Sequence, residues 1–174
     1  MTSPPVAGVD SGRRGRARPT VSRRGGLIAA VAAIVVALDQ VTKTWALHAF
    51  AQAPRHVVWT LQLVVQFNSG IAFSQATGAT VLVTIIAIVV LLALVIVAAR
   101  TTGMFTAVVL GLVMGGAIGN LVDRLIRHHG GAVIDWIDLR WWPVFNLADA
   151  AITIGVVLAL ARSVLRPDRE RPVG

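Results

Sequence analysis

The chain has 174 residues, of which 56% are hydrophobic and 14% are charged, and its mean hydropathy is +0.75. Soluble domains carry about 25% charged residues, so this composition excludes an ordinary soluble protein and indicates an integral membrane protein. The absence of cysteine excludes disulfides, thiol nucleophiles and cysteine metal sites. A net charge of +8 fits nucleic-acid binding. The arginines, however, cluster in the two tails beside apolar segments, so we expect no nucleic-acid partner.

The first 24 residues are rich in proline, glycine, serine and arginine and lack apolar periodicity, which predicts a disordered basic tail over residues 1–24. Ser22-Arg23-Arg24 before an apolar run resembles a twin-arginine export signal. The run itself, residues 26–47, is as long as a spanning helix, and no small-residue cleavage site follows it. We therefore expect a retained membrane anchor and not a cleaved signal.

Three further apolar segments, residues 79–99, 102–121 and 144–160, have about the length that crosses a bilayer. Between the first two spans, residues 56–67 mix apolar and polar side chains with many β-branched residues, which predicts strands at the membrane surface. The sequence therefore predicts an all-α membrane protein with four transmembrane helices and a small β-containing loop region outside the cell. It predicts one membrane domain over residues 25–165 and a short tail over residues 166–174.

The arginines beside the helices predict how the chain is oriented. Both termini and the turn after residue 99 carry them, so the positive-inside rule places these parts in the cytoplasm. Loops 48–78 and 122–143 then face outward, although Arg124, Arg127 and Arg140 reduce the contrast. The flanking arginines are Arg13, Arg14, Arg16, Arg18, Arg23, Arg24, Arg100, Arg162, Arg166, Arg169 and Arg171.

Five aspartates lie inside or next to the apolar segments: Asp39, Asp123, Asp135, Asp138 and Asp149. A carboxylate near the centre of a membrane helix costs about 2.5–3.5 kcal/mol on insertion scales, so such groups indicate functional sites. Asp39 and Lys43 are four residues apart and can pair on one helix face. This spacing fits a structural ion pair between packed helices as well as it fits a role in a site.

Two glycine-containing motifs also fit more than one role. Residues 68–70, Asn-Ser-Gly, predict a turn when taken alone. Glycines spaced by four along residues 111–119 form a smooth ridge for close helix packing, and the same face continues to Asp123. Asn120 and Arg124, again four apart, can pair. This polar cluster fits either a ligand site deep in the bundle or a helix end among lipid headgroups.

Asp135 ends a short apolar segment of the outer loop, while Asn146 and Asp149 are expected to share a face in the first turns of the last helix. Two carboxylates held close together do not both ionise easily, so one retains a proton. An acid beside a base is the arrangement that activates water against an amide in aspartic proteases. The histidines lack partners at metal-ligand spacing, so we expect no metal site and no cofactor.

Five motifs occur in order along the four predicted helices: Asp39-x-x-x-Lys43, Asn68-x-Gly70-x-Ala72-Phe73, Gly116-x-x-Gly119-Asn120-x-x-Asp123-Arg124, Val133-x-Asp135 and Phe145-Asn146-x-Ala148-Asp149. In this combination they resemble the lipoprotein signal peptidase (signal peptidase II) family, over residues 27–162. Two features depart from the family pattern. Trp136 stands where the family usually has phenylalanine, and the loop from Arg124 to Asp135 is longer than in many members.

The resemblance implies an intramembrane aspartic endopeptidase of the bacterial plasma membrane. Such enzymes remove the signal peptide from diacylglyceryl-modified prolipoproteins at the lipidated cysteine, with the active site towards the extracytoplasmic face. It implies that Asp135 and Asp149 are the catalytic pair. The residues that it implies in substrate binding or support are Asn68, Gly70, Asn120, Arg124, Asn146, Asp39, Lys43 and Asp123. We expect a monomer whose partners are these prolipoproteins and membrane lipid.

Two other classes of function stay open from the residues alone. Intramembrane aspartate and arginine also mark the ion pathways of proton-coupled carriers and channels. Transport predicts polar residues spread through the bilayer, repeats and broken helices, whereas residues 79–99 are wholly apolar and the acids gather at one face. The glycine ridge alone suits a non-enzymatic assembly factor, but that function leaves Asp135 and Asp149 without a role.

Overall fold

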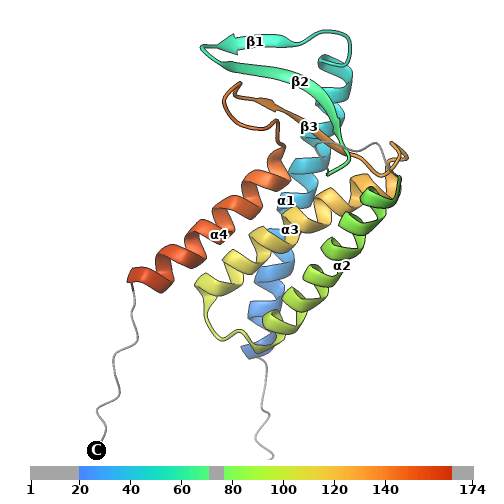
Figure 1. Cartoon of the computed structure of the whole chain (residues 1–174). Coiled ribbons are helices and arrows are strands. Elements are labelled where there is room, and N and C mark those ends of the chain that lie inside the picture. The colour runs from blue at the N-terminus through green and yellow to red at the C-terminus, as the bar shows by residue number, and fades with distance from the viewer. Residues whose placement is uncertain (1–19, 71–76, 166–174) are drawn as a thin grey trace, which may run out of the picture.

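The structure is a computed structural model that describes residues 20–70 and 77–165. Its described elements are α1 (Thr20–Ala49), β1 (Arg55–Val58), β2 (Leu61–Asn68), α2 (Thr77–Arg100), α3 (Met104–Ile126), β3 (Val133–Asp138) and α4 (Leu147–Leu165). All four helices are long and apolar enough to cross a membrane. The strands form an antiparallel sheet in the order β1-β2-β3 at one end of the helices (Figure 1). This architecture confirms the predicted fold class.

The helix boundaries differ from the prediction at several ends. Helix α1 begins at Thr20, so residues 20–24 are helical and do not belong to the predicted tail. Arginine has a high helix propensity, so backbone hydrogen bonding continues past the apolar run. Helix α3 likewise continues to Ile126, beyond the predicted end at residue 121. The predictions for other tail residues and for part of one motif lie outside the described residues; these include Arg13, Arg14, Arg16, Arg18, Ala72, Phe73, Arg166, Arg169 and Arg171.

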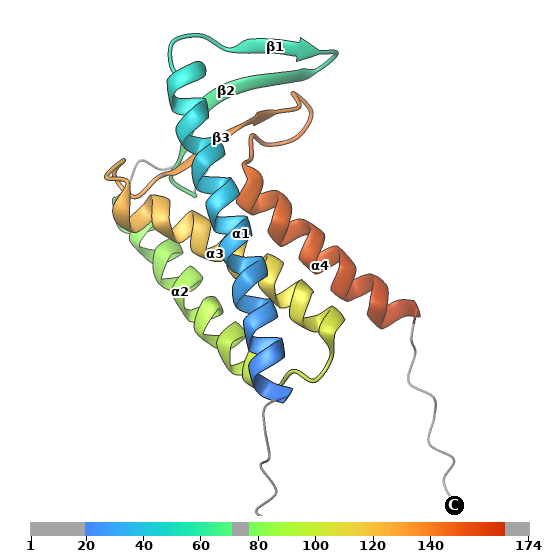
Figure 2. The same ribbon diagram turned by 180° about the vertical axis from the view of Figure 1, so that it is seen from behind.

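Helix α3 lies between α1 and α4 and packs closely against both (Figures 1 and 2). The glycines of the predicted ridge allow the contact with α1, and Gly116 beside the ridge allows the contact with α4. A Cβ at Gly115 would lie 2.8 Å from the Val35 Cβ of α1, and a Cβ at Gly116 would overlap the carbonyl oxygen of Ala148 in α4. Small residues allow membrane helices to approach to van der Waals contact. The predicted packing role of the ridge is therefore confirmed.

The sheet joins the loops that the sequence left outside the helices. Strands β1 and β2 confirm the strands expected over residues 56–67, but β3 was not predicted. In the register of β2 with β3, Gln66 lies opposite Asp135. The longer loop before β3 turns through His128, Gly130 and Gly131, whose φ angles of 56°, 64° and 78° are left-handed. This turn reverses the chain so that β3 returns over the end of α3.

Basic residues gather at the end of the bundle opposite the sheet. The first turns of α1 and the last turns of α2 and α4 lie at that end (Figures 1 and 2). They carry Arg23, Arg24, Arg100 and Arg162. The two ends of the molecule therefore differ both in charge and in secondary structure.

Replacing Gly116 by alanine tests the close approach of α3 and α4. The added methyl group would overlap the Ala148 carbonyl oxygen, so the helices must separate. We expect a loss of about 1–3 kcal/mol of stability, which is typical of overpacking, measured as a lower midpoint of thermal unfolding in detergent. Gly26→Ala is the control, because no described atom lies within 4 Å of its added Cβ. Equal midpoints for the two variants would contradict the packing described above.

Candidate active site

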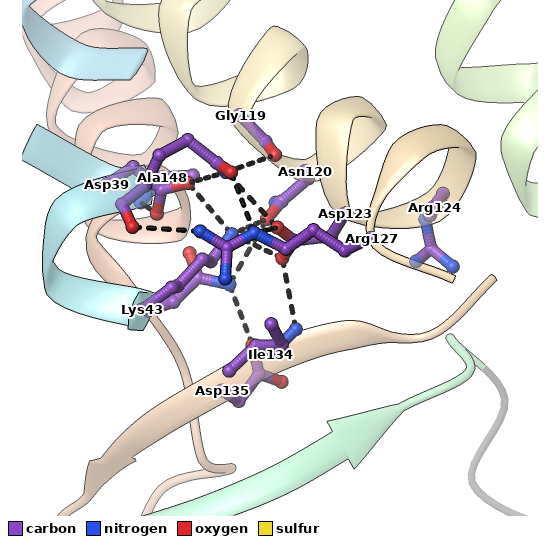
Figure 3. A network of polar contacts seen from close by, with 12 residues as sticks. Asp39, Lys43, Gly119, Asn120, Asp123, Arg124, Arg127, Ile134, Asp135 and Ala148 are labelled. Atoms are coloured by element: carbon purple, nitrogen blue, oxygen red, sulfur yellow. Dashed lines mark hydrogen bonds and ion pairs between the residues drawn. The ribbon is translucent and has the colours of Figure 1, made fainter. Parts of the chain in front are cut away.

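Polar groups from β3 and three helices meet where the sheet joins the bundle (Figure 3), and Asn68 of β2 bonds to this cluster through Asp135. Asp39, Lys43, Asp123 and Asn146 are 0% exposed and Asp135 is 1% exposed. Charged groups are almost never fully buried unless they are paired, so the partners of each group determine what the cluster can do. Asp123, at the polar end of α3, is thus buried, while Asn120 and Arg124 beside it are partly exposed.

Asp135 lies on β3 and is held by two asparagine amides. Its Oδ1 accepts a hydrogen bond from Asn146 Nδ2 at 2.7 Å, and its Oδ2 accepts one from Asn68 Nδ2 at 2.9 Å. Burial raises the pKa of Asp135 to about 6. The nearby charge of Asp149 raises it further, whereas the two amides and Lys43 oppose the shift. Asp135 therefore exchanges its proton close to neutral pH.

Asp149 lies in the first turn of α4 and is partly exposed. Its Oδ1 accepts a hydrogen bond from Asn120 Nδ2 at 2.8 Å. The backbone N–H of Asp149 donates to Asn146 Oδ1 at 2.9 Å, and the N–H of Asn146 donates back to Asp149 Oδ2 at 3.3 Å. This reciprocal pair is a capping box. Asn146 is thus the N-cap of α4, and the prediction that it lies within the helix was wrong by one position.

The Asn146 side chain connects the Asp135 carboxylate to the backbone of Asp149. Its Oδ1 is occupied by the α4 cap, so its Nδ2 must point the other way, towards Asp135. The structure therefore brings the two aspartates that the sequence singled out into one site, with three asparagine side chains orienting their oxygens.

Two further aspartates hold the backbone beside this pair. Asp39 Oδ1 accepts the N–H of Ala148 at 3.0 Å, and Asp123 Oδ2 accepts the N–H of Ile134 at 3.0 Å. Ala148 immediately precedes Asp149, and Ile134 immediately precedes Asp135. Each buried carboxylate of the helices thus fixes the chain at the residue before one member of the pair.

Lys43 joins these two supports. Its Nζ lies 2.8 Å from Asp39 Oδ2 and 2.7 Å from Asp123 Oδ2, and it donates to Asn120 Oδ1 at 3.1 Å. The predicted Asp39–Lys43 pair is confirmed, and the structure extends it to α3. The ion pair is structural, yet through Asn120 it also reaches Asp149.

Arg124 does not make the predicted contact with Asn120. Its Nη1 donates to the Gly131 carbonyl at 3.0 Å and lies 3.5 Å from the Ser69 carbonyl, so it ties two outer loops together. The reason is that both ends of the Asn120 amide are already engaged, by Asp149 on one side and by Lys43 on the other. The pairing prediction from spacing alone was therefore wrong.

Asn68 has both roles that its motif suggested. Its Oδ1 accepts the N–H of Gly70 at 2.8 Å, which closes the predicted turn, while its Nδ2 binds Asp135. Gly70 has a φ of 88°, and a Cβ there would lie 3.2 Å from Arg124 Nη2. Glycine therefore suits this turn in both conformation and space.

Sequence reasoning missed Gln40 and gave Arg127 no role in the site. The Gln40 Nε2 lies 3.1 Å from Asp39 Oδ2, from Asp123 Oδ1 and from the Gly119 carbonyl. A polar residue next to a buried aspartate in an apolar helix was the available signal. Asp138 belongs elsewhere, because its Oδ1 accepts the N–H of Arg140 in the turn after β3.

An apolar cavity of about 380 Å³ adjoins Asp149. Trp141 and Trp142, in its wall, are 70% and 58% exposed, so the cavity lies at the surface of the molecule. Its lining residues are Leu139, Trp141, Trp142, Phe145, Asp149, Ala150, Thr153 and Ile154. The site thus combines a buried carboxyl group, a more accessible carboxyl group and an adjacent space suited to apolar chains.

Comparison with known proteins gives one consistent result. The family model described as signal peptidase (SPase) II matches residues 31–165. A lipoprotein signal peptidase of Rhodococcus jostii (strain RHA1) is 38% identical over 163 residues, covering 88% of this chain and 81% of the relative. A lipoprotein signal peptidase of Mycobacterium avium (strain 104) is 41% identical over 155 residues, covering 84% and 83%.

Solved structures show the same likeness in three dimensions. A bacterial membrane enzyme determined by the in meso method at 2.3 Å resolution is 29% identical, with a TM-score of 0.72, covering 86% of this chain and 94% of that chain. A second such structure, at 1.9 Å resolution, is 30% identical, with the same TM-score and coverages of 82% and 95%. The fold thus has counterparts in experimentally determined structures.

Proposed function

Because the chain belongs to the signal peptidase II family, we propose that Asp135 and Asp149 are the catalytic pair with which it cleaves the signal peptides of prolipoproteins. Members of this family are aspartic peptidases, and the chain is a multi-pass membrane protein of bacterial type. Family membership therefore favours the enzyme over the carrier and the assembly factor. The observation that carries the assignment of the pair is Asn146, whose side-chain amide donates to the Asp135 carboxylate and whose backbone N–H donates to the Asp149 carboxylate.

The proposed reaction requires one proton shared by the pair. The ionised carboxylate removes a proton from water, while the protonated carboxyl group donates a hydrogen bond to the scissile carbonyl. Water oxygen then bonds to the carbonyl carbon, and collapse of the tetrahedral intermediate breaks the C–N bond. The leaving amine takes a proton from the pair. General acid–base help of this kind contributes about 10²–10⁴-fold, so positioning and electrostatic stabilisation must supply the rest.

The substrate that we propose carries a diacylglyceryl group on the cysteine that becomes the new N-terminus. The apolar cavity beside Asp149 supports this proposal, because it offers room for an apolar chain next to a carboxylate. A lipid-anchored precursor would enter laterally from the outer leaflet with its acyl chains still in lipid. We also propose that the chain acts as a monomer in one membrane domain.

Substitution of each aspartate tests the pair. We expect Asp135→Asn and Asp149→Asn each to lower cleavage of a diacylglyceryl-modified precursor by at least about 10²-fold, because neither variant can share a proton between two carboxyl groups. Purified protein is assayed for released signal peptide. Asp138→Asn is the matched control, since Asp138 lies on the same strand but caps the Arg140 turn. Substantial turnover by either of the first two variants would refute the pair, and equal cleavage of an unlipidated precursor would refute the lipid requirement.

The raised pKa of Asp135 predicts how activity varies with pH. Asp135 holds its proton below about pH 6, and the singly protonated pair is lost as pH rises through that value. We therefore expect kcat/KM to decline above about pH 6, because this parameter reports the free enzyme. Bound substrate excludes water and so makes ionisation of the buried carboxyl group harder. We therefore expect kcat to decline at a higher pH than kcat/KM does. A profile of kcat/KM that is flat from pH 5 to pH 8 would contradict this assignment.

We also propose that the sheet faces the extracytoplasmic side and that both termini are cytoplasmic. The support is the group of arginines at the opposite end of the bundle. Because the chain has no cysteine, single cysteines can be introduced at Val57 in the sheet and at Thr102 between α2 and α3. In intact spheroplasts a membrane-impermeant maleimide should label the Val57→Cys variant, and the Thr102→Cys variant only after lysis. The reverse pattern would invert the topology.

A further inference from the structure

The ion network beneath the proposed catalytic pair contains more negative than positive charges when only its fully buried side chains are counted. Asp39 and Asp123 carry two negative charges, and Lys43 supplies one positive charge between them. An uncompensated charge in a low-dielectric interior is very costly. Within residues 20–70 and 77–165, the second cation in salt-bridge contact with this network is Arg127, whose Nε lies 3.5 Å from Asp123 Oδ1.

Arg127 is held firmly at that position. It is the C-cap residue of α3, and its side chain is 17% exposed. Its Nε donates to Gln40 Oε1 at 2.9 Å, and its Nη2 donates to the Gln40 carbonyl at 2.9 Å and to Thr44 Oγ1 at 2.7 Å. These bonds tie the end of α3 to one turn of α1 (Figure 3). The guanidinium therefore closes the outer side of the network.

The contact with Gln40 also fixes which way that amide points. Because the Gln40 oxygen accepts from Arg127, its nitrogen must face inward, where it donates to both Asp39 and Asp123. Asp123 in turn holds the Ile134 N–H next to Asp135. A continuous series of polar contacts thus leads from Arg127 to the backbone on which Asp135 lies.

We propose that Arg127 is a positioning residue for the catalytic pair, supplying the second positive charge of the buried network and locking Gln40, Asp123 and hence β3 in place. The inference rests on the proposed role of Asp135 and Asp149. Arg127 does not touch the pair and acts through Asp123 and Gln40.

The proposal predicts an electrostatic effect on the pair as well as a geometric one. Loss of the Arg127 charge leaves the surrounding acids in excess, so both proton dissociations of the pair shift to higher pH. The charged and titratable groups on the neighbouring elements are Asp39, Lys43 and His48 of α1, Asp123 and Arg124 of α3, His128 and His129 of the following turn, Asp135 of β3 and Asp149 of α4. Among these, only the histidines titrate ordinarily near neutral pH, so their variants are needed as controls.

The experiment compares Arg127→Gln, Arg127→Lys and the matched control Arg55→Gln, which removes an exposed arginine from β1. We expect Arg127→Gln to lower kcat about tenfold and to move the alkaline limb of kcat/KM upward by about half a pH unit. Arg127→Lys keeps the positive charge, so the alkaline limb of kcat/KM should lie at the same pH as in the wild-type protein. It should restore kcat only in part, because lysine lacks the planar guanidinium that binds Gln40 and Thr44. Arg55→Gln and the alanine variants of His48, His128 and His129 should leave the limb unchanged.

A second readout separates this proposal from the catalytic assignment. The carboxyl stretch of Asp135, identified by infrared difference against Asp135→Asn, is titrated in folded wild-type protein and in Arg127→Gln. An upward shift of that titration supports the role of Arg127 even if the pair proves not to be catalytic. An unchanged titration, or an Arg127→Gln profile that matches Arg55→Gln, would overturn the proposal. The proposal would also be overturned if the activity of Arg127→Gln fell only in proportion to the unfolded fraction, with no shift in the pH profile of kcat/KM or in the infrared titration of Asp135.

Discussion

The single ammonium group of Lys43, shared between two carboxylates, is the interaction on which the rest of the site depends. It allows Asp39 and Asp123 to be buried together, and each of them then binds the backbone one residue before a member of the proposed catalytic pair. Breaking a buried ion pair typically costs about 3–5 kcal/mol because it leaves a charge unpaired, so the arrangement is strongly cooperative. Helix packing and active-site geometry are therefore not separable in this protein. The glycines that bring α3 against α1 and α4 also bring these carboxylates within reach of Lys43.

The proposed pair is asymmetric although its members are chemically identical. Asp135 is buried on a strand, whereas Asp149 is partly exposed at a helix N-terminus and lines an apolar cavity. Different surroundings separate the proton affinities of two like carboxyl groups, which is how one pair provides both an acid and a base. Asn68, Asn120 and Asn146 also orient the two carboxyl groups. Each of them is committed at its oxygen to another contact, so its nitrogen faces a carboxylate and its orientation is fixed.

Much of the fold and of the candidate site could be predicted from the sequence. Hydropathy gave the four helices because a bilayer demands long apolar runs, and the aspartates were conspicuous because carboxylates are costly there. A spacing of four residues predicted the side-chain pair correctly where no group from another element displaces either partner, as for Asp39 and Lys43. It failed for Asn120 and Arg124, because partners from other elements occupied Asn120 first. The strand β3 pairs with β2 at separations of 65 to 76 positions, and the contacts of Gln40 with Asp123 and Arg127 span 83 and 87 positions, so no local pattern encodes them. The Asn146 cap was the exception, since a capping box is a local signal and was available.

The bond from Asp39 to the Ala148 backbone has a consequence for when the enzyme can first act. It joins positions 109 residues apart, from the first membrane helix to the start of the last. During synthesis the segments enter the membrane in order, and until α4 arrives there is no Asp149, no Asn146 cap and no Ala148 N–H for Asp39 to bind. Asp39 is then paired within its own helix, with Lys43, and the proposed catalytic pair lacks one member. Under the proposed assignment, the catalytic pair is thus complete only when the last helix of the bundle is in place.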